Sequence, residues 1–198
     1  GGGYGVTFLD PEGRRIRLIA ESARHADARV ERDRPERLSH LVFNCLDADA
    51  MKSFYIAALD FSLSDHTRIM NFIRCNSDHH SIALVYAQQA TLHHVAFDMP
   101  DLDSVMRGAG RMKDAGFPIE WGVGRHGPGN NVFAYFVAPG GIPIEYTSEV
   151  EQIDDSYIAH GPDYWKWPPG RIDHWGIAPP PSQALDEAQR HVRFAERP

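Results

Sequence analysis

Two stretches of the chain share one pattern of apolar and polar positions, and each leads into an amphipathic helix pattern. Residues 38–43 (Leu-Ser-His-Leu-Val-Phe) and 92–97 (Leu-His-His-Val-Ala-Phe) align at a constant offset, and each predicts a half-buried strand. Apolar residues then recur at the spacing of one helix face, at Met51, Phe54, Tyr55, Ala58 and Leu59 and again at Leu102, Val105, Met106, Ala109 and Met112. The chain therefore contains an internal repeat.

Each copy continues into further short apolar runs. These runs are residues 71–75 and 81–86 in the first copy and 131–137 and 142–146 in the second. Asp47 and Asp101 stand where a helix N-cap is expected, and Gly116 is expected to end the second helix. The pattern predicts an α+β protein made of two βαβββ modules, about residues 38–90 and 91–150.

Residues 1–20 resemble the end of the second module. Phe8, Pro11 and Gly13 match Phe136, Pro139 and Gly141 at a second constant offset. Because Pro-x-Gly is a turn signal, we expect a closing hairpin of a preceding module, joined by a linker over residues 21–37. The alternative is an independent hairpin attached to a single domain.

Residues 151–198 form a tail with its own composition. Tyr157, Tyr164, Trp165, Trp167 and Trp175 lie among several prolines. Such a segment is expected to cover a surface or cross the mouth of a pocket. Ser182 to Phe194 predicts a terminal amphipathic helix with Ser182 as its cap.

Composition and charge narrow the class of protein. The 198 residues are 42% hydrophobic and 24% charged, which is typical of a globular chain. A net charge of −7 argues against a nucleic-acid partner. No run approaches the ~18 apolar residues of a membrane span, so we expect no membrane partner. Two cysteines, Cys45 and Cys75, make no disulfide framework, so we expect a cytoplasmic protein.

The repeat also selects candidate metal ligands among the 11 histidines. His40 and His94 hold the same place in the two opening strands, and Glu145 lies in the last strand of the second copy. If the opening strands pack side by side, the three side chains can face one concavity. Two imidazoles and one carboxylate on one side of a metal are the ligand set of non-haem Fe(II) oxygenases. For Glu145 the alternative is a solvent-facing position on an edge strand.

Neighbouring histidines are expected to play other parts. His79 and His93 are predicted to face away from the histidines that follow them and to serve the structure. Arg17 holds the position of Glu145 in the first hairpin, and an arginine cannot bind a cation. We therefore expect no metal in that preceding module.

Four ordered segments extend this pattern. They are Leu-Ser-His40, Asn76-Ser-Asp-His79-His80, Leu-His-His94, and a long segment from Gly124-Arg-His126 through Tyr135 and Pro139-Gly-Gly141 to Glu145. Together they resemble the type I extradiol catechol dioxygenases of the vicinal oxygen chelate (glyoxalase–bleomycin resistance–dioxygenase) superfamily. The resemblance covers residues 38–150 well, residues 1–20 as the remnant of a preceding module, and the tail weakly.

This resemblance implies a fold, a cofactor and a reaction. The fold would be paired βαβββ modules forming a curled mixed sheet around a metal. His40, His94 and Glu145 match the ligands of Fe(II), with Mn(II) as a possible substitute. His80, His126 and Tyr135 match the catalytic residues around the bound catechol and oxygen. The implied reaction inserts O2 into a substituted catechol beside the diol, and a homo-oligomer is expected.

Two departures leave the substrate open. Ala134 replaces a larger apolar residue, and Gly-Pro-Gly-Asn-Asn follows His126 where cleavers of biphenyl diols carry polar and acidic residues. A small-molecule-sequestering protein and a glyoxalase-type isomerase remain as alternatives. Burying three polar ligands unpaired argues against the first. The second usually adds a fourth ligand, and residues 81–85 offer none beyond the adjacent His80.

Overall fold

The computed structural model describes residues 3–23 and 33–194, and it contains the βαβββ unit twice. The first module comprises β3 (Arg37–Cys45), α1 (Ala48–Leu59), β4 (Ser62–His66), β5 (Met70–Arg74) and β6 (Ile82–Tyr86). The second comprises β7 (Thr91–Asp98), α2 (Leu102–Asp114), β8 (Trp121–Arg125), β9 (Val132–Ala138) and β10 (Ile142–Ser148). The predicted α+β class and the paired modules are confirmed.

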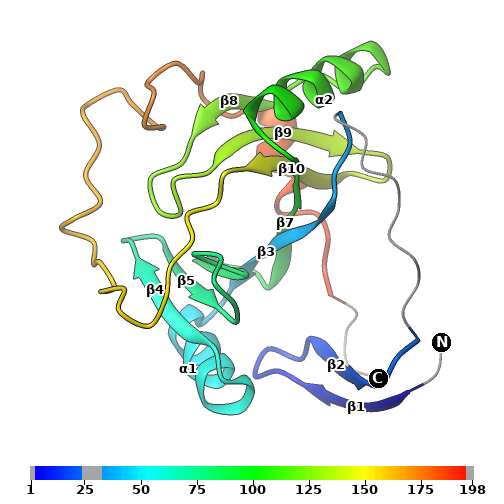
Figure 1. Ribbon diagram of the computed structural model, residues 1–198, viewed down its shortest axis with the longest axis vertical. Coiled ribbons are helices and arrows are strands. Elements are labelled where there is room, and N and C mark those ends of the chain that lie inside the picture. Colours follow the sequence, from blue (N-terminus) through cyan, green and yellow to red (C-terminus); the bar gives the residue numbers. More distant parts are fainter. Residues whose placement is uncertain (1–2, 24–32, 195–198) are drawn as a thin grey trace.

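The two modules share one mixed sheet of eight strands in the order β4-β5-β6-β3-β7-β10-β9-β8 (Figure 1). The opening strands β3 and β7 pair antiparallel at its centre, whereas β6 and β10 run parallel to them on either side. The arrangement around the β3–β7 pair is therefore nearly symmetric. This symmetry places equivalent residues of the two modules close together.

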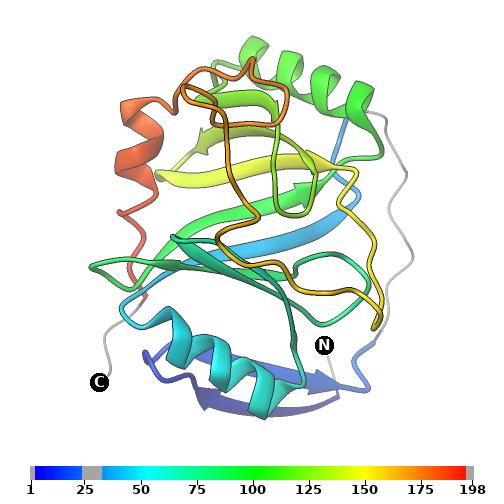
Figure 2. The same cartoon turned by 90° about the vertical axis from the view of Figure 1, so that its left-hand side faces the viewer.

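The module helices α1 and α2 cover the outer face of the sheet and leave its other face for a site. Figure 2 shows α1 and α2 at opposite ends of the curled sheet. Phe43 and Cys45 pack with Met51 of α1 in one core, so alternation turns Val42 of β3 to the inner face. A second core joins α2 to β9 and β10.

Both module helices begin as their sequences predict, and α2 also ends where its sequence predicts. The Asp47 carboxylate accepts a hydrogen bond from the Ala50 N–H at 2.9 Å, and the Asp101 carboxylate accepts one from the Ser104 N–H at 2.7 Å. Gly116, with φ of 88°, follows the cap residue of α2 in the left-handed region. Glycine adopts this conformation without steric cost, which ends the helix there.

Residues 1–20 contain the predicted hairpin, formed by β1 (Tyr4–Leu9) and β2 (Arg15–Ala20). It lies against α1, with the Phe8 and Phe54 ring centroids 6.2 Å apart. That this hairpin closes a preceding module stays a prediction. The predicted linker falls largely on residues 24–32, which lie outside the described residues.

Arg14, which forms a buried ion pair within the hairpin turn, also binds the hairpin to the first module. Arg14 lies 3.2 Å from the buried Asp10 carboxylate and donates a hydrogen bond to the Asn44 carbonyl at 2.7 Å. Its guanidinium also lies over the rings of Phe43 and Phe194, at 5.1 and 4.8 Å from their centroids. The hairpin is thereby held to β3.

The tail is mostly irregular, and its helix is shorter than predicted. Ser182 does cap α3, but the helix spans only Gln183–Ala188, so the predicted helix to Phe194 is wrong. The residues after the helix pair with β7 instead, since the Leu92 N–H donates a hydrogen bond to the Val192 carbonyl at 2.9 Å. The segment before α3 (orange in Figure 2) crosses in front of the sheet. None of the described helices is long and apolar enough to cross a membrane.

The ion pair of Arg14 gives a stability prediction. In Arg14→Met the Asp10 carboxylate stays buried without its cationic partner, which should lower the free energy of unfolding by about 3 kcal/mol. Arg17→Met is the matched control, because Arg17 lies exposed on the same hairpin and should change stability by less than ~0.5 kcal/mol. Urea unfolding measures both, and equal midpoints for the two variants would contradict the assignment.

Candidate active site

Three neighbouring strands bring the candidate metal ligands together. His40 lies on β3, His94 on β7 and Glu145 on β10. Because β10 lies between β7 and β9, Glu145 is on an interior strand and its side chain is fully buried. The solvent-facing alternative for Glu145 therefore does not hold.

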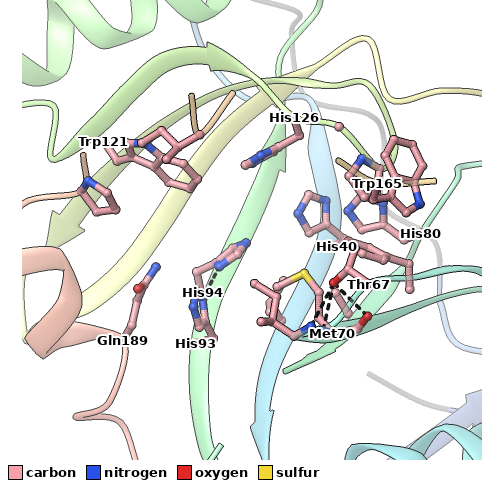
Figure 3. Close-up of a pocket in the computed structure, with 18 of the residues that line it drawn as sticks. His40, Thr67, Met70, His80, His93, His94, Trp121, His126, Trp165 and Gln189 are labelled. Carbon is pink, nitrogen blue, oxygen red and sulfur yellow. Dashed lines mark hydrogen bonds between the residues drawn. The ribbon is translucent and has the colours of Figure 1, made fainter. Parts of the chain in front are cut away.

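The ligand atoms of this triad converge. His94 Nε2 lies 3.0 Å and His40 Nε2 lies 3.3 Å from Oε2 of Glu145. One ligand atom from each of the three residues lies within 4.8 Å of the other two. Figure 3 shows the two imidazoles on neighbouring strands at the same cavity.

The contacts inside the triad leave polar atoms without hydrogen bonds. His94 Nε2 and Glu145 Oε2 are buried and have no hydrogen-bond partner among the described residues, despite their short separation. Leaving such atoms unpaired in the interior is costly. The geometry is explained if the lone pairs of His94 Nε2 and Glu145 Oε2 both point to a third group that lies between them. A cation is the group that would satisfy both lone pairs. The donor set thus fits a divalent metal.

Two β-bulges in the sheet provide hydrogen-bond partners for the Nδ1 atoms of His40 and His94. The β3–β7 register shifts at Ser39 and again at His93, so each is the extra residue of a β-bulge just before a candidate ligand. Ser39 Oγ lies 3.1 Å from His40 Nδ1, and His93 Nδ1 lies 2.7 Å from His94 Nδ1. A proton held on Nδ1 of the ligand leaves its Nε2 free for a metal.

The bulge also corrects one expectation from the sequence. His93 was expected to face away from His94, but it lines the same cavity (Figure 3). Simple strand alternation fails here because the bulge turns two consecutive side chains to one side. His79, in contrast, is fully buried beside His80 and does not line the cavity.

The protonation states of the triad also suit a metal. Burial alone raises the pKa of Glu145, but His40 and His94 outweigh it and hold that pKa well below its usual range. Burial lowers the pKa of His94, against the opposing effect of Glu145. The site thus combines an ionised carboxylate with a neutral imidazole, which are the forms that bind cations.

The three predicted catalytic residues lie around the triad. The His80 ring is buried, with its centroid 4.3 Å from that of His40. His126 Nε2 lies 3.7 Å from Oε1 of Glu145 and 3.1 Å from the Tyr135 hydroxyl. The structure therefore brings all six predicted residues to one place.

Burial sets the proton affinity of these three groups. It lowers the pKa of His80 well below its usual range, together with the nearby His40 and His79. It lowers the pKa of His126 to about 4. Burial, with Glu145 nearby, raises the pKa of Tyr135 well above its usual value. Near neutral pH the two imidazoles are neutral and the phenol keeps its proton.

The triad opens onto a cavity of about 460 Å³. Its walls include Val42, Phe72 and Ala83 from the first module, and Trp165 and Trp167 from the tail. Gly127 is required next to Trp167, because a Cβ there would lie only 1.9 Å from the indole. A mostly apolar cavity with a few converging polar groups is typical of a small-molecule site.

Comparison with known proteins places the chain in a superfamily. The model of the Glyoxalase/Bleomycin resistance protein/Dioxygenase superfamily matches residues 37–146, and the chain belongs to this superfamily. Metapyrocatechase 2 of Cupriavidus necator is 34% identical over 152 residues, covering 69% of this chain and 48% of that protein. Biphenyl-2,3-diol 1,2-dioxygenase of Paraburkholderia xenovorans is 29% identical over 141 residues, covering 65% of this chain and 47% of that protein. The chain thus spans about half the length of these relatives.

Solved structures agree with the fold. The crystal structure of the Mn(II)-bound glyoxalase from Novosphingobium aromaticivorans is 41% identical, with a TM-score of 0.84 over 93% of this chain and 62% of that one. The 2,2′,3-trihydroxybiphenyl 1,2-dioxygenase of Sphingomonas wittichii has a TM-score of 0.71 at 24% identity, covering 87% of this chain and 63% of that one. The second likeness shows the fold alone. The resemblance predicted from the motifs is confirmed.

Replacement of Glu145 tests the proposed metal site. Glu145→Gln removes the negative charge of the triad while keeping its shape. The affinity for Fe(II) should fall by more than the ~10–100-fold typical of losing an outer partner of a ligand. Anaerobic equilibrium dialysis with elemental analysis measures this affinity.

Glu149→Gln is the matched control, because Glu149 is exposed and pairs with Arg125 outside the triad. It should bind one metal ion per chain as the unchanged protein does. Equal metal content in Glu145→Gln and Glu149→Gln would contradict the site.

Proposed function

We propose that this protein is an extradiol dioxygenase, which opens the ring of a substituted catechol beside the diol by inserting both atoms of O2. The single observation that carries the proposal is the convergence of two imidazoles and one carboxylate at the wall of a largely apolar cavity. The relatives named as ring-cleaving dioxygenases support it.

His40, His94 and Glu145 are proposed to hold Fe(II). Two nitrogen donors and one oxygen donor suit a divalent first-row metal, and Mn(II) is the second candidate because a Mn(II)-bound protein is among the similar structures. Such a metal would act as a Lewis acid that lowers the pKa of the diol and would supply the redox chemistry with O2.

The neighbouring side chains would manage protons and hydrogen bonds. His80 is neutral and buried beside His40, so a free ring nitrogen can accept a proton from a substrate hydroxyl and return it later. Tyr135 keeps its proton because its pKa is raised, so its hydroxyl can donate a hydrogen bond to a substrate oxygen. His126 contacts that hydroxyl and fixes its position.

The cavity walls would select and shield the aromatic ring. Phe72 and Ala83 provide an apolar surface on one side, and Trp165 provides an aromatic one from the tail. Excluding water strengthens the hydrogen bonds inside the site and protects the reacting groups. These walls favour a catechol with an apolar substituent.

A glyoxalase-type isomerase is the second candidate, favoured by the similarity to the Mn(II)-bound glyoxalase. Isomerases of this superfamily usually bind their metal through a fourth protein ligand. Within the described residues, the group of possible ligands holds only His40, His94 and Glu145. This favours the dioxygenase.

Oxygen uptake tests the function. Protein loaded anaerobically with Fe(II) should consume one O2 for each diol and form a yellow ring-opened product from catechol, 3-methylcatechol or biphenyl-2,3-diol. His80→Ala should lower kcat by about 10²–10⁴-fold, because the proton acceptor is lost. His191→Ala, at an exposed histidine outside the cavity, should leave kcat unchanged.

Metal content distinguishes the outcomes of this test. A protein that binds Fe(II) but consumes no O2 with any of the three diols would contradict the dioxygenase. Conversion of the hemithioacetal of methylglyoxal and glutathione by the same protein would support the isomerase.

A further inference from the structure

His80 is the end of a buried chain of polar groups. Its Nδ1 lies 3.1 Å from Nδ1 of His79, and Nε2 of His79 lies 2.8 Å from Oδ2 of Asp65. Asp65 and His79 are completely buried, and His80 is nearly so. This series of hydrogen-bonded side chains runs from Asp65 in the interior of the protein to His80 at the wall of the cavity.

Asp65 determines which ring nitrogen of His79 carries a proton. Its carboxylate also receives the backbone N–H of His160 at 2.6 Å and the Tyr157 hydroxyl at 3.1 Å. An ionised carboxylate can only accept hydrogen bonds. The 2.8 Å contact with His79 therefore requires a proton on Nε2 of His79.

This proton fixes the tautomer of His80 in turn. A neutral His79 that is protonated at Nε2 has an unprotonated Nδ1, which can only accept. With His79 neutral, the 3.1 Å contact between the two Nδ1 atoms requires a proton on Nδ1 of His80. The remaining nitrogen of His80, Nε2, is left unprotonated on a ring that lines the cavity (Figure 3).

We propose that Asp65 and His79 are positioning residues that hold His80 as the Nδ1–H tautomer, with Nε2 free to accept a proton from the substrate. The chemical part of this inference rests on the proposed function. The tautomer itself follows from the contacts of Asp65 and His79 and can be tested without any substrate.

Asp65 also connects the hydrogen-bonded histidines to the tail. The two tail residues that contact it, Tyr157 and His160, lie close to the cavity wall, since the His160 ring stacks on Tyr164 at 4.0 Å and lies 6.0 Å from Trp165. Replacing Asp65 would therefore loosen the tail as well as free His79. Variants of His79 give the cleaner test.

The first measurement is the tautomer of His80 in the metal-free protein. Nitrogen-15 NMR of the histidine rings should show the proton of His80 on Nδ1 in the unchanged protein. In His79→Phe, which removes the acceptor and keeps a ring, the proton should move wholly or partly to Nε2. A proton on Nε2 of His80 in the unchanged protein would overturn the inference.

The second measurement is kinetic, on the Fe(II)-loaded enzyme. His79→Phe should lower kcat about 10–100-fold with little change in the KM for the diol, because orientation and not binding is lost. His79→Asn should recover much of this kcat, since its side-chain oxygen can accept the hydrogen bond from Nδ1 of His80. A purely structural role would give equal losses in both variants, and that result would overturn the inference.

His160→Phe is the matched control. His160 contacts the same carboxylate through its ring and its backbone, yet it does not contact His80. Its replacement should leave the tautomer of His80 and the kcat nearly unchanged. If the unchanged protein cleaves no diol, the proposed function fails, whereas the NMR result still decides the roles of Asp65 and His79.

Discussion

The antiparallel pairing of β3 with β7 is the constraint on which the site depends. It joins the two modules at the centre of the sheet and sets His40 beside His94 across the module boundary. Glu145 reaches the same point because β10 runs parallel to β7 on the other side. A slip of one residue in either pairing would turn these side chains to the opposite face and disperse the triad. The site is thus a product of register between strands far apart in the sequence.

Two buried carboxylates, Glu145 and Asp65, belong to the proposed site, and a third, Asp10, belongs to the N-terminal hairpin. The surroundings that stabilise the first two differ from those of Asp10. Asp10 faces the guanidinium of Arg14, which compensates its charge directly. Glu145 contacts three histidines instead, and Asp65 contacts two. Imidazoles can change protonation or bind a metal, which a guanidinium cannot do. The negative charge of Glu145 can therefore bind a cation, and that of Asp65 can orient the histidines that accept a proton.

The sequence predicts the fold and the positions of His40 and His94 because the chain is duplicated, whereas His80, His126 and Tyr135 followed from the resemblance to the extradiol dioxygenases. The constant offset between the modules identified both module helices, their N-caps and the pair of His40 and His94. Glu145 followed from a charged residue in an apolar strand. These signals are local or repeat at fixed spacing, so periodicity and capping rules are enough to find them.

Other features depend on contacts that no local pattern records. The bulge that turns His93 toward His94 arises from a register shift between two strands. The early end of α3 results from pairing of Val192 with Leu92, which competes with the helix. Asp65 lies 14 residues before His79, and only the folded sheet brings the two side chains together. The chain of contacts behind His80 was for this reason not predicted.

The most direct test of the account is a crystal of the anaerobically Fe(II)-loaded protein measured at the iron absorption edge. The account predicts one strong anomalous peak bounded by Nε2 of His40, Nε2 of His94 and a carboxylate oxygen of Glu145. A peak at another position, or a loaded protein in which these three side chains contact no metal, would contradict it.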